Sequence, residues 1–276
     1  MSDNDAQMRS RSYSLAVEDT EFLKRDELRA LRFAMEYAKA ELLLRDWGIR
    51  STVVVFGSAR ILDPELARQR LKQASTGEEK RLAQCQAKQA RWYEEARRFA
   101  RIVSERGGAL NAEHRLRDNV IATGGGPGIM EAANRGARDA GAPTIGFNIT
   151  LPHEQEPNAY STPDLTFRFH YFAMRKMHLA MRANALAVFP GGFGTFDELF
   201  EILTLLQTRK APPMPVLLFG RAFWTKAVNF RALIAEGTIA ADDLALFDIV
   251  EEAEEGWAML MKHGLKAHSP PSLPGA

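Results

Sequence analysis

The chain has 276 residues, 46% of them hydrophobic, and its 36 basic and 35 acidic residues give a formal net charge of +1. This is the composition of a globular protein with no overall attraction to nucleic acid or to an acidic membrane, so we expect neither as a partner. Cys85 is the single cysteine, which excludes an intrachain disulfide. No secretory signal and no apolar run of ~18 residues is found, so we expect a cytoplasmic protein without a membrane span.

The N-terminal part predicts an arm, a helix and a strand. Residues 1–19 are polar and mixed in charge, so we expect a disordered arm. Apolar residues at helical spacing predict one amphipathic helix over residues 21–47. Thr52–Phe56 has the sequence TVVVF, a β-branched run typical of a strand buried on both faces. Gly57 and Ser58 follow at once as a strand-to-loop turn.

A helical insertion is expected at residues 62–91, followed by a crossover helix at residues 92–107. Residues 64–91 contain seven basic and three acidic residues. Such a face can contact RNA, a partner protein or an anionic ligand, but a solvated helix face is the more common meaning.

A second strand and glycine-rich loop follow. Residues 119–122 predict a short strand, residues 123–128 have the sequence TGGGPG, and a helix is expected over residues 129–140. This is not a dinucleotide-binding fingerprint, because Ile129 occupies the position of the third glycine. The chain also lacks the GxxxxGK[ST] pattern of P-loop nucleotidases.

The next segments predict further alternation of strands and helices. Residues 144–149 predict a strand, residues 150–169 a polar connection, and residues 172–187 a helix that contains Arg175 and Lys176. Later strands are expected at residues 216–219 and 247–250, helices at residues 221–236 and 253–262, and a flexible tail at residues 269–276.

The most informative stretch is a strand at residues 185–189, a glycine loop and a helix from Thr195 onward. Gly191, Gly192 and Gly194 allow the backbone to approach a ligand, and a helix N-terminus favours a phosphate. Residues 195–198 also fit a capping box, so Glu198 has a purely structural alternative.

Strands that alternate with helices predict an α/β fold, a Rossmann-like doubly wound parallel sheet with helices on both faces. We expect one such domain at residues 20–268, to which the N-terminal helix and the insertion are additions. Three strand ends carry glycine-rich loops, which favours a whole nucleotide as ligand because ligands bind at the carboxyl ends of such strands.

The sequence PGGFGTFDE at residues 190–198 and the pair Arg175-Lys176 match two motifs of a known family. The chain resembles the Lonely Guy (LOG) family, whose plant members are cytokinin riboside 5′-monophosphate phosphoribohydrolases. Many bacterial members resemble general nucleotide hydrolases acting on AMP, and many were mislabelled as lysine decarboxylases. The resemblance covers residues 52–262. The chain departs from the family pattern at Pro127, Ile129 and Ala132.

The resemblance implies a catalytic pair, Arg175 and Glu198. It also implies substrate contacts in the glycine loops and nearby helices, to which the first strand end adds two residues. Together the expected substrate-binding residues are Gly57, Ser58, Gly125, Gly126, Met130, Glu154, Lys176, Gly191, Gly192, Phe193, Gly194, Thr195 and Thr204.

N-glycosidic hydrolysis passes through a positively charged sugar, which a carboxylate can stabilise. Placed in a first helical turn, Glu198 is expected to stay ionised at neutral pH. Arg175 suits a phosphate or the departing base, although a surface ion pair is its structural alternative. Lys176 lies ~100° further round the helix, so both cations cannot face one atom.

The expected function is hydrolysis of a nucleoside 5′-monophosphate, AMP or a cytokinin ribotide, to free base and ribose 5-phosphate by a homodimer or larger homo-oligomer. The alternative is a carrier of a phosphorylated ligand similar to molybdenum-cofactor carrier proteins. The six histidines form no metal motif, so we expect neither metal nor cofactor. Nothing resembles a pyridoxal-phosphate lysine, which argues against lysine decarboxylation.

Overall fold

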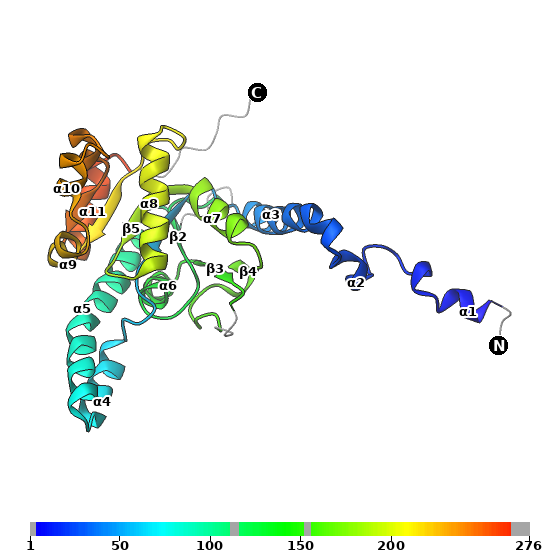
Figure 1. Cartoon of the computed structure of the whole chain (residues 1–276), viewed down its shortest axis with the longest axis horizontal. Helices are drawn as coiled ribbons and strands as arrows, with labels where there is room; N and C mark the ends of the chain where they lie inside the picture. Colours follow the sequence, from blue (N-terminus) through cyan, green and yellow to red (C-terminus); the bar gives the residue numbers. More distant parts are fainter. Residues whose placement is uncertain (1–3, 111–115, 152–155, 266–276) are drawn as a thin grey trace.

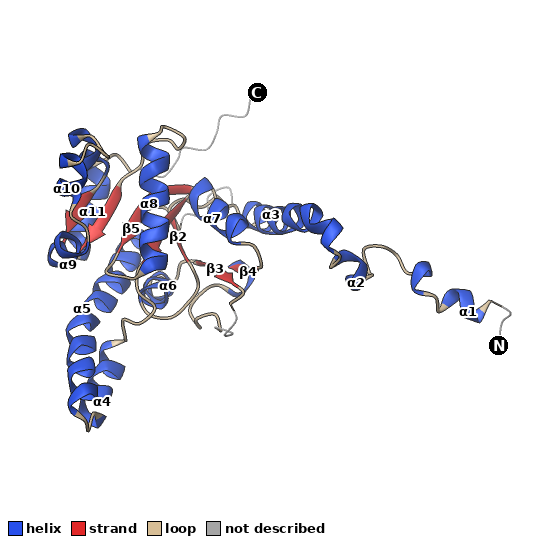
Figure 2. Cartoon of the chain, in the orientation of Figure 1, coloured by secondary structure: helices blue, strands red, loops and turns tan. Residues whose placement is uncertain are grey.

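A parallel sheet forms the centre of the molecule, and the strands follow the order β4-β3-β2-β1-β5-β6-β7. In this computed structural model the described residues are 4–110, 116–151 and 156–265. Helices cover both faces of the sheet (Figures 1 and 2), which confirms the predicted Rossmann-like architecture. The strands are β1 (Thr52–Phe56), β2 (Val120–Thr123), β3 (Ile145–Ile149), β4 (Thr166–Phe169), β5 (Ala183–Val188), β6 (Val216–Phe219) and β7 (Asp248–Val250).

The helices lie before the first strand, between the strands and, in the case of α11, after the last strand. The α-helices are α1 (Asp5–Met8), α2 (Thr20–Leu23), α3 (Arg29–Asp46), α4 (Pro64–Gln73), α5 (Gly77–Arg106), α6 (Ile129–Asp139), α7 (Phe172–Met181), α8 (Phe193–Gln207), α9 (Arg221–Ala227), α10 (Phe230–Ala235) and α11 (Ala253–Lys262). The short 3₁₀ helices are η1 (Arg11–Tyr13), η2 (Asp26–Leu28), η4 (Pro163–Leu165) and η5 (Ala241–Leu246). None of the described helices is long and apolar enough to cross a bilayer.

The strand order places a topological switch point beside β1. From β1 the chain adds β2, β3 and β4 on one side, and then returns to add β5, β6 and β7 on the other. At such a point the loops that follow the two neighbouring strands diverge and leave a crevice at their carboxyl ends. The fold therefore creates its crevice between the ends of β1 and β5.

Alternating side chains of the central strands build two apolar cores. Val53 and Val55 of β1 point to the layer of α5, α6 and α11. Val54 and Phe56 point to the opposite layer, which includes α3, α7, α8 and α9. Because both faces are buried, the strands are continuous apolar runs, which made β1 and β6 recognisable in the sequence.

The N-terminal part differs from the predicted single helix. Residues 4–28 extend away from the sheet (Figure 1) as short helices that bury no residue, where residues 1–19 were expected to be disordered. The predicted helix over residues 21–47 is broken between α2 and α3. Arg32 Nη1 donates hydrogen bonds to the carbonyl oxygens of Leu23 (2.8 Å) and Arg25 (2.6 Å), which satisfies backbone groups released by the break.

The insertion and the crossover helix are one element. The boundary predicted near residue 91 is wrong, because α5 is continuous from Gly77 to Arg106. The break lies instead between α4 and α5, where Thr76 and Glu79 form a capping box. The predicted helix over residues 221–236 is likewise broken, since Asn229 caps the separate helix α10.

Strand β4 was missed, and so was the early start of β5. The polar connection predicted at residues 150–169 ends in β4, an edge strand that buries only Phe167 and Phe169 in alternation. The helix predicted over residues 172–187 ends at Met181, because β5 begins at Ala183 and pairs with β1. Tertiary pairing overrides local helix propensity there.

The contact between α5 and α6 generates the first prediction. A Cβ added to Gly136 would overlap the backbone carbonyl of Arg97, with its carbon 2.8 Å away. Gly136→Ala should lower the free energy of unfolding by about 3 kcal/mol, because a backbone group in a packed interface cannot move aside. Gly77→Ala is the control, since nothing lies within 4 Å of its added Cβ. Urea unfolding of both variants checks this, and equal losses would contradict it.

Candidate active site

A pocket of about 770 Å³ occupies the crevice at the switch point. It is formed by the loop after β1, the start of α6, the first turns of α7 and α8, and the end of α9. Its lining residues are Phe56, Gly57, Ser58, Ala59, Arg60, Met130, Arg175, Gly192, Phe193, Gly194, Thr195, Phe196 and Ala227. Seven of the substrate-binding residues predicted from the sequence are in this set: Gly57, Ser58, Met130, Gly192, Phe193, Gly194 and Thr195.

The glycines of the loop before α8 have two different explanations. A Cβ on Gly191 would overlap the Thr195 side chain, with Thr195 Cβ 2.6 Å away. By contrast, nothing lies within 4 Å of a Cβ on Gly192 or Gly194, and both residues line the pocket. Internal packing therefore requires Gly191 only, and the other two leave space beside the first N–H groups of α8, which lack intrahelical acceptors.

The first two glycine loops touch each other. Ile129 N donates to Ser58 O (3.2 Å), and Gly128 has a positive φ of 71° where its backbone crosses the loop after β1. An added Cβ on Gly124 would lie 2.9 Å from Met130 Sδ and 3.4 Å from Arg175 Nη2. This loop is therefore a close neighbour of the predicted catalytic arginine.

Gly125 and Gly126 lie behind the pocket and do not line it. Asn158 N donates to Gly125 O (2.9 Å) and Asn158 Nδ2 donates to Gly126 O (3.0 Å). The amide of Asn158 also donates to Asn134 Oδ1 (2.9 Å), which ties the loop to α6. The structure places these two glycines in a buried polar network that shapes the loop.

Arg175 and Glu198 come together from α7 and α8. Arg175 Nη2 lies 3.7 Å from Glu198 Oε1, and the two side chains are only 13% and 6% exposed. That distance is an ion pair without a hydrogen bond. The Nε of Arg175 has no hydrogen-bond partner among the described residues. Arg175 is therefore a buried cation that lines the pocket with unused donor capacity, not the surface ion pair of the structural alternative.

The first-turn position that was expected to keep Glu198 ionised is wrong. Burial raises the pKa of Glu198 from 4.5 to about 7, although Arg175 and Lys176 act in the opposite direction. The N-cap of α8 is Gly192, so Glu198 stands in the second turn, beyond the first-turn N–H groups. The capping box suggested at residues 195–198 is absent for the same reason. Burial also lowers the pKa of the Arg175 guanidinium.

Lys176 and Thr204, also predicted from the sequence, do not line the pocket. Lys176 Nζ lies 2.9 Å from Asp197 and 2.8 Å from Glu201, so its charge is already paired between α7 and α8. Thr204 faces away and donates its hydroxyl to Phe200 O (2.7 Å). Glu154 lies outside the described residues. Glu198 itself stands one side chain behind the pocket wall and is joined to it through Arg175.

Sequence reasoning missed Arg60 and Asn158. Arg60 lines the pocket from the loop after β1 and adds a cation beside the glycine loops. A basic residue just after a buried strand of a parallel sheet was the available signal. Asn158 could not be found, because its role depends on a fold of the 156–162 segment against a distant loop.

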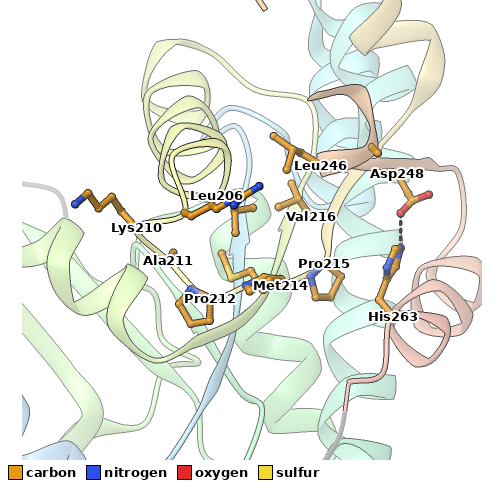
Figure 3. Close-up of a pocket in the computed structure, with 13 residues that line it drawn as sticks. Leu206, Lys210, Ala211, Pro212, Met214, Pro215, Val216, Leu246, Asp248 and His263 are labelled. Carbon is orange, nitrogen blue, oxygen red and sulfur yellow. Dashed lines mark hydrogen bonds and ion pairs between the residues drawn. The ribbon is translucent and has the colours of Figure 1, made fainter. Parts of the chain in front are cut away.

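A second pocket, of about 610 Å³, lies near the start of β6 (Figure 3). Leu206, Met214, Val216 and Leu246 give it an apolar lining, and His263 Nε2 lies 2.7 Å from Asp248 Oδ2 at one end. It contains none of the predicted site residues. Among the described residues no group of three or more His, Cys, Asp or Glu could hold a metal ion.

Comparison with known proteins gives a family match and several distant relatives. A family model described as "Possible lysine decarboxylase" matches residues 130–260, which include both Arg175 and Glu198. The cytokinin riboside 5′-monophosphate phosphoribohydrolase LOG of Oryza sativa subsp. japonica is 28% identical over 127 residues, 45% of this chain and 51% of the relative. Its Arabidopsis thaliana counterpart LOG2 is 27% identical over 104 residues, 36% of this chain and 47% of the relative.

The resemblance to the Lonely Guy family is confirmed. The matches span about half the length of these curated relatives. Two solved structures are also similar to this one over most of the chain. The molybdenum cofactor binding protein of Rippkaea orientalis is 17% identical with a TM-score of 0.45, covering 78% of this chain and 96% of that one. The Moco carrier protein of Chlamydomonas reinhardtii is 19% identical, also with a TM-score of 0.45, covering 77% and 96%. Such values do not bear on function.

The raised pKa of Glu198 predicts a pH-dependent stability. Between pH 4.5 and about 7 the unfolded chain ionises Glu198 while the folded protein keeps it protonated. The free energy of unfolding should therefore fall by about 3 kcal/mol across this window relative to Glu198→Gln, and stay level above it. Urea unfolding of both proteins at pH 4.5 and pH 8 measures this. A constant difference between them would show that folding leaves the pKa of Glu198 unchanged.

The two kinds of loop glycine predict opposite outcomes. Gly191→Ala should lower the free energy of unfolding by about 2 kcal/mol, because its Cβ meets Thr195. Gly192→Ala should change it by less than about 1 kcal/mol, yet weaken AMP binding at least tenfold by filling space beside the helix terminus. Urea unfolding and titration calorimetry with AMP test the pair. Unchanged AMP affinity in Gly192→Ala would remove that residue from the ligand site.

Proposed function

We propose that this protein hydrolyses the N-glycosidic bond of a nucleoside 5′-monophosphate and releases free base and ribose 5-phosphate. The observation that carries the proposal is the buried Arg175–Glu198 pair, in which Arg175 lines a pocket that also includes the first residues of α8 and Glu198 stands directly behind Arg175. The relatives named above are cytokinin riboside 5′-monophosphate phosphoribohydrolases. AMP is the further substrate that the family resemblance implies.

The phosphate would bind at the start of α8. Gly192 and Gly194 leave room for its oxygens next to backbone N–H groups, and the helix dipole favours negative charge at that position. Arg60 supplies a side-chain cation on the neighbouring loop. Phe193 is 96% exposed at the pocket mouth and offers a ring to the base or sugar.

Glu198 and Arg175 would act at the glycosidic bond. Water supplies a hydroxyl group to C1′ of the ribose, and its proton ends on the departing base. A carboxyl group whose pKa is about 7 holds or releases a proton readily at neutral pH, and its ionised form stabilises the positive sugar. Arg175 has unused donors for the phosphate or the base.

The geometry argues against the activity named in the family description. A lysine that forms a Schiff base needs a depressed pKa. Lys176 is held instead between the carboxylates of Asp197 and Glu201. Burial lowers its pKa, but its hydrogen bonds to these carboxylates and the nearby negative charges together raise it above the ordinary value. The proposal includes a homodimer or larger homo-oligomer, as the family resemblance implies. A cytoplasmic location and the lack of a cofactor remain predictions from the sequence.

Chromatography of free base tests the proposal after incubation with AMP, other nucleoside monophosphates and isopentenyl-AMP. We expect base from at least one monophosphate, and a loss of about 10²-fold or more in kcat for Glu198→Gln. Glu254→Gln is the matched control, because its carboxylate is exposed and paired with Arg106 on the far helix layer. Full turnover by Glu198→Gln would refute the assigned role. Tight nucleotide binding without base release would favour the carrier alternative.

A further inference from the structure

Helix α7 begins without a cap from its own sequence. Its N-cap residue is Tyr171, whose side chain accepts no hydrogen bond from the first turn. Arg175 belongs to that turn, and its backbone N–H bonds to Tyr171 O at 3.3 Å. The predicted catalytic arginine thus depends on a helix end whose N–H groups need an acceptor from elsewhere.

Glu36 of α3 supplies an acceptor for the N-cap residue Tyr171 and for His170 before it. Its Oε1 accepts a hydrogen bond from His170 N (2.8 Å), and its Oε2 accepts one from Tyr171 N (3.2 Å). Two adjacent backbone groups therefore share one carboxylate from a helix more than a hundred residues earlier. A negative charge at the N-terminal end of α7 also interacts favourably with the positive end of the helix dipole.

Neighbouring contacts hold Glu36 in place. The rings of Phe33 and Tyr171 meet edge to face with centroids 4.1 Å apart, and Arg32 Nε donates to Tyr171 OH (3.1 Å). One turn further along, Tyr37 stacks on the buried ring of His178 at 5.3 Å. Figure 1 shows α3 beside α7, so these contacts form one continuous helix interface.

We propose that Glu36 is a positioning residue that fixes the first turn of α7 and thereby the Arg175 side chain. This inference rests on the function proposed above and assigns a role to the N-terminal helix, which lies outside the family resemblance. Without the Glu36 carboxylate, the N–H groups of His170 and Tyr171 lose their acceptor, and Tyr171 is the N-cap residue whose carbonyl accepts from Arg175 N. We therefore expect the first turn of α7 to loosen before the rest of the helix. That turn contains Arg175.

The same interface provides a matched control. Glu41 of α3 pairs with Arg182 at 2.6 Å, at the opposite end of α7 from the first turn. Both carboxylates are partly buried and both join α3 to α7. Glu36→Gln and Glu41→Gln therefore remove similar interface contacts, but only the first removes the cap beside Arg175.

The test compares steady-state base release by both variants with urea unfolding and backbone hydrogen exchange. Glu36→Gln keeps one acceptor oxygen, so we expect kcat to fall about fivefold, as the loss of one cap implies, with KM within twofold. Glu41→Gln should keep kcat within twofold of the wild type at a comparable loss of stability. Exchange at residues 172–176 should rise in Glu36→Gln only.

Equal effects of the two variants on kcat and on exchange would overturn the positioning role and leave a general packing role. An unchanged kcat in Glu36→Gln would overturn it as well. If the wild-type protein releases no base from any nucleotide, the proposed function fails. The exchange measurement then still decides whether Glu36 orders the first turn of α7.

Discussion

The candidate site is built around one buried pair, Arg175 and Glu198, held 3.7 Å apart. Removing two charges from water is costly, and mutual attraction compensates only when hydrogen bonds complete the pair. Here the pair lacks such a bond and Arg175 Nε has no partner among the described residues. Burial raises the pKa of Glu198 to about 7. Under the proposed function, an anionic ligand in the pocket that Arg175 lines would give the guanidinium a further acceptor.

The switch point explains why this pair can form. Helix α7 precedes β5 and helix α8 follows it, so both helices lie near the same central strand and contribute to the same core. The loops after β1 and β5 diverge above that strand and leave the pocket that Arg175 enters. Parallel topology thus brings together a cation from the helix that precedes β5 and a carboxylate from the helix that follows it. Both lie next to the N-terminus of α8.

The sequence predicted those features whose causes are local. Strand β1 and helix α11 were predicted with correct bounds, because burial on both faces imposes continuous apolar runs and helices impose their own spacing. Strand β4 was missed since its two buried residues are too few to form a pattern. The protonation of Glu198 was missed for a different reason: burial by distant elements, not position in its own helix, determines its pKa.

Three cations lie in α7 or directly after it, and they differ in how closely carboxylates pair with them. Lys176 has two carboxylates within 2.9 Å, and Arg182 meets Glu41 at 2.6 Å. Arg175 has the same kind of partner but only at 3.7 Å, although it is as buried as Arg182. Sequence alone cannot rank these residues, because the three side chains differ little in type. Arg175, which has no carboxylate within hydrogen-bond distance, is the cation that we propose for the ligand. Lys176 and Arg182, which are closely paired, hold α7 against its neighbours.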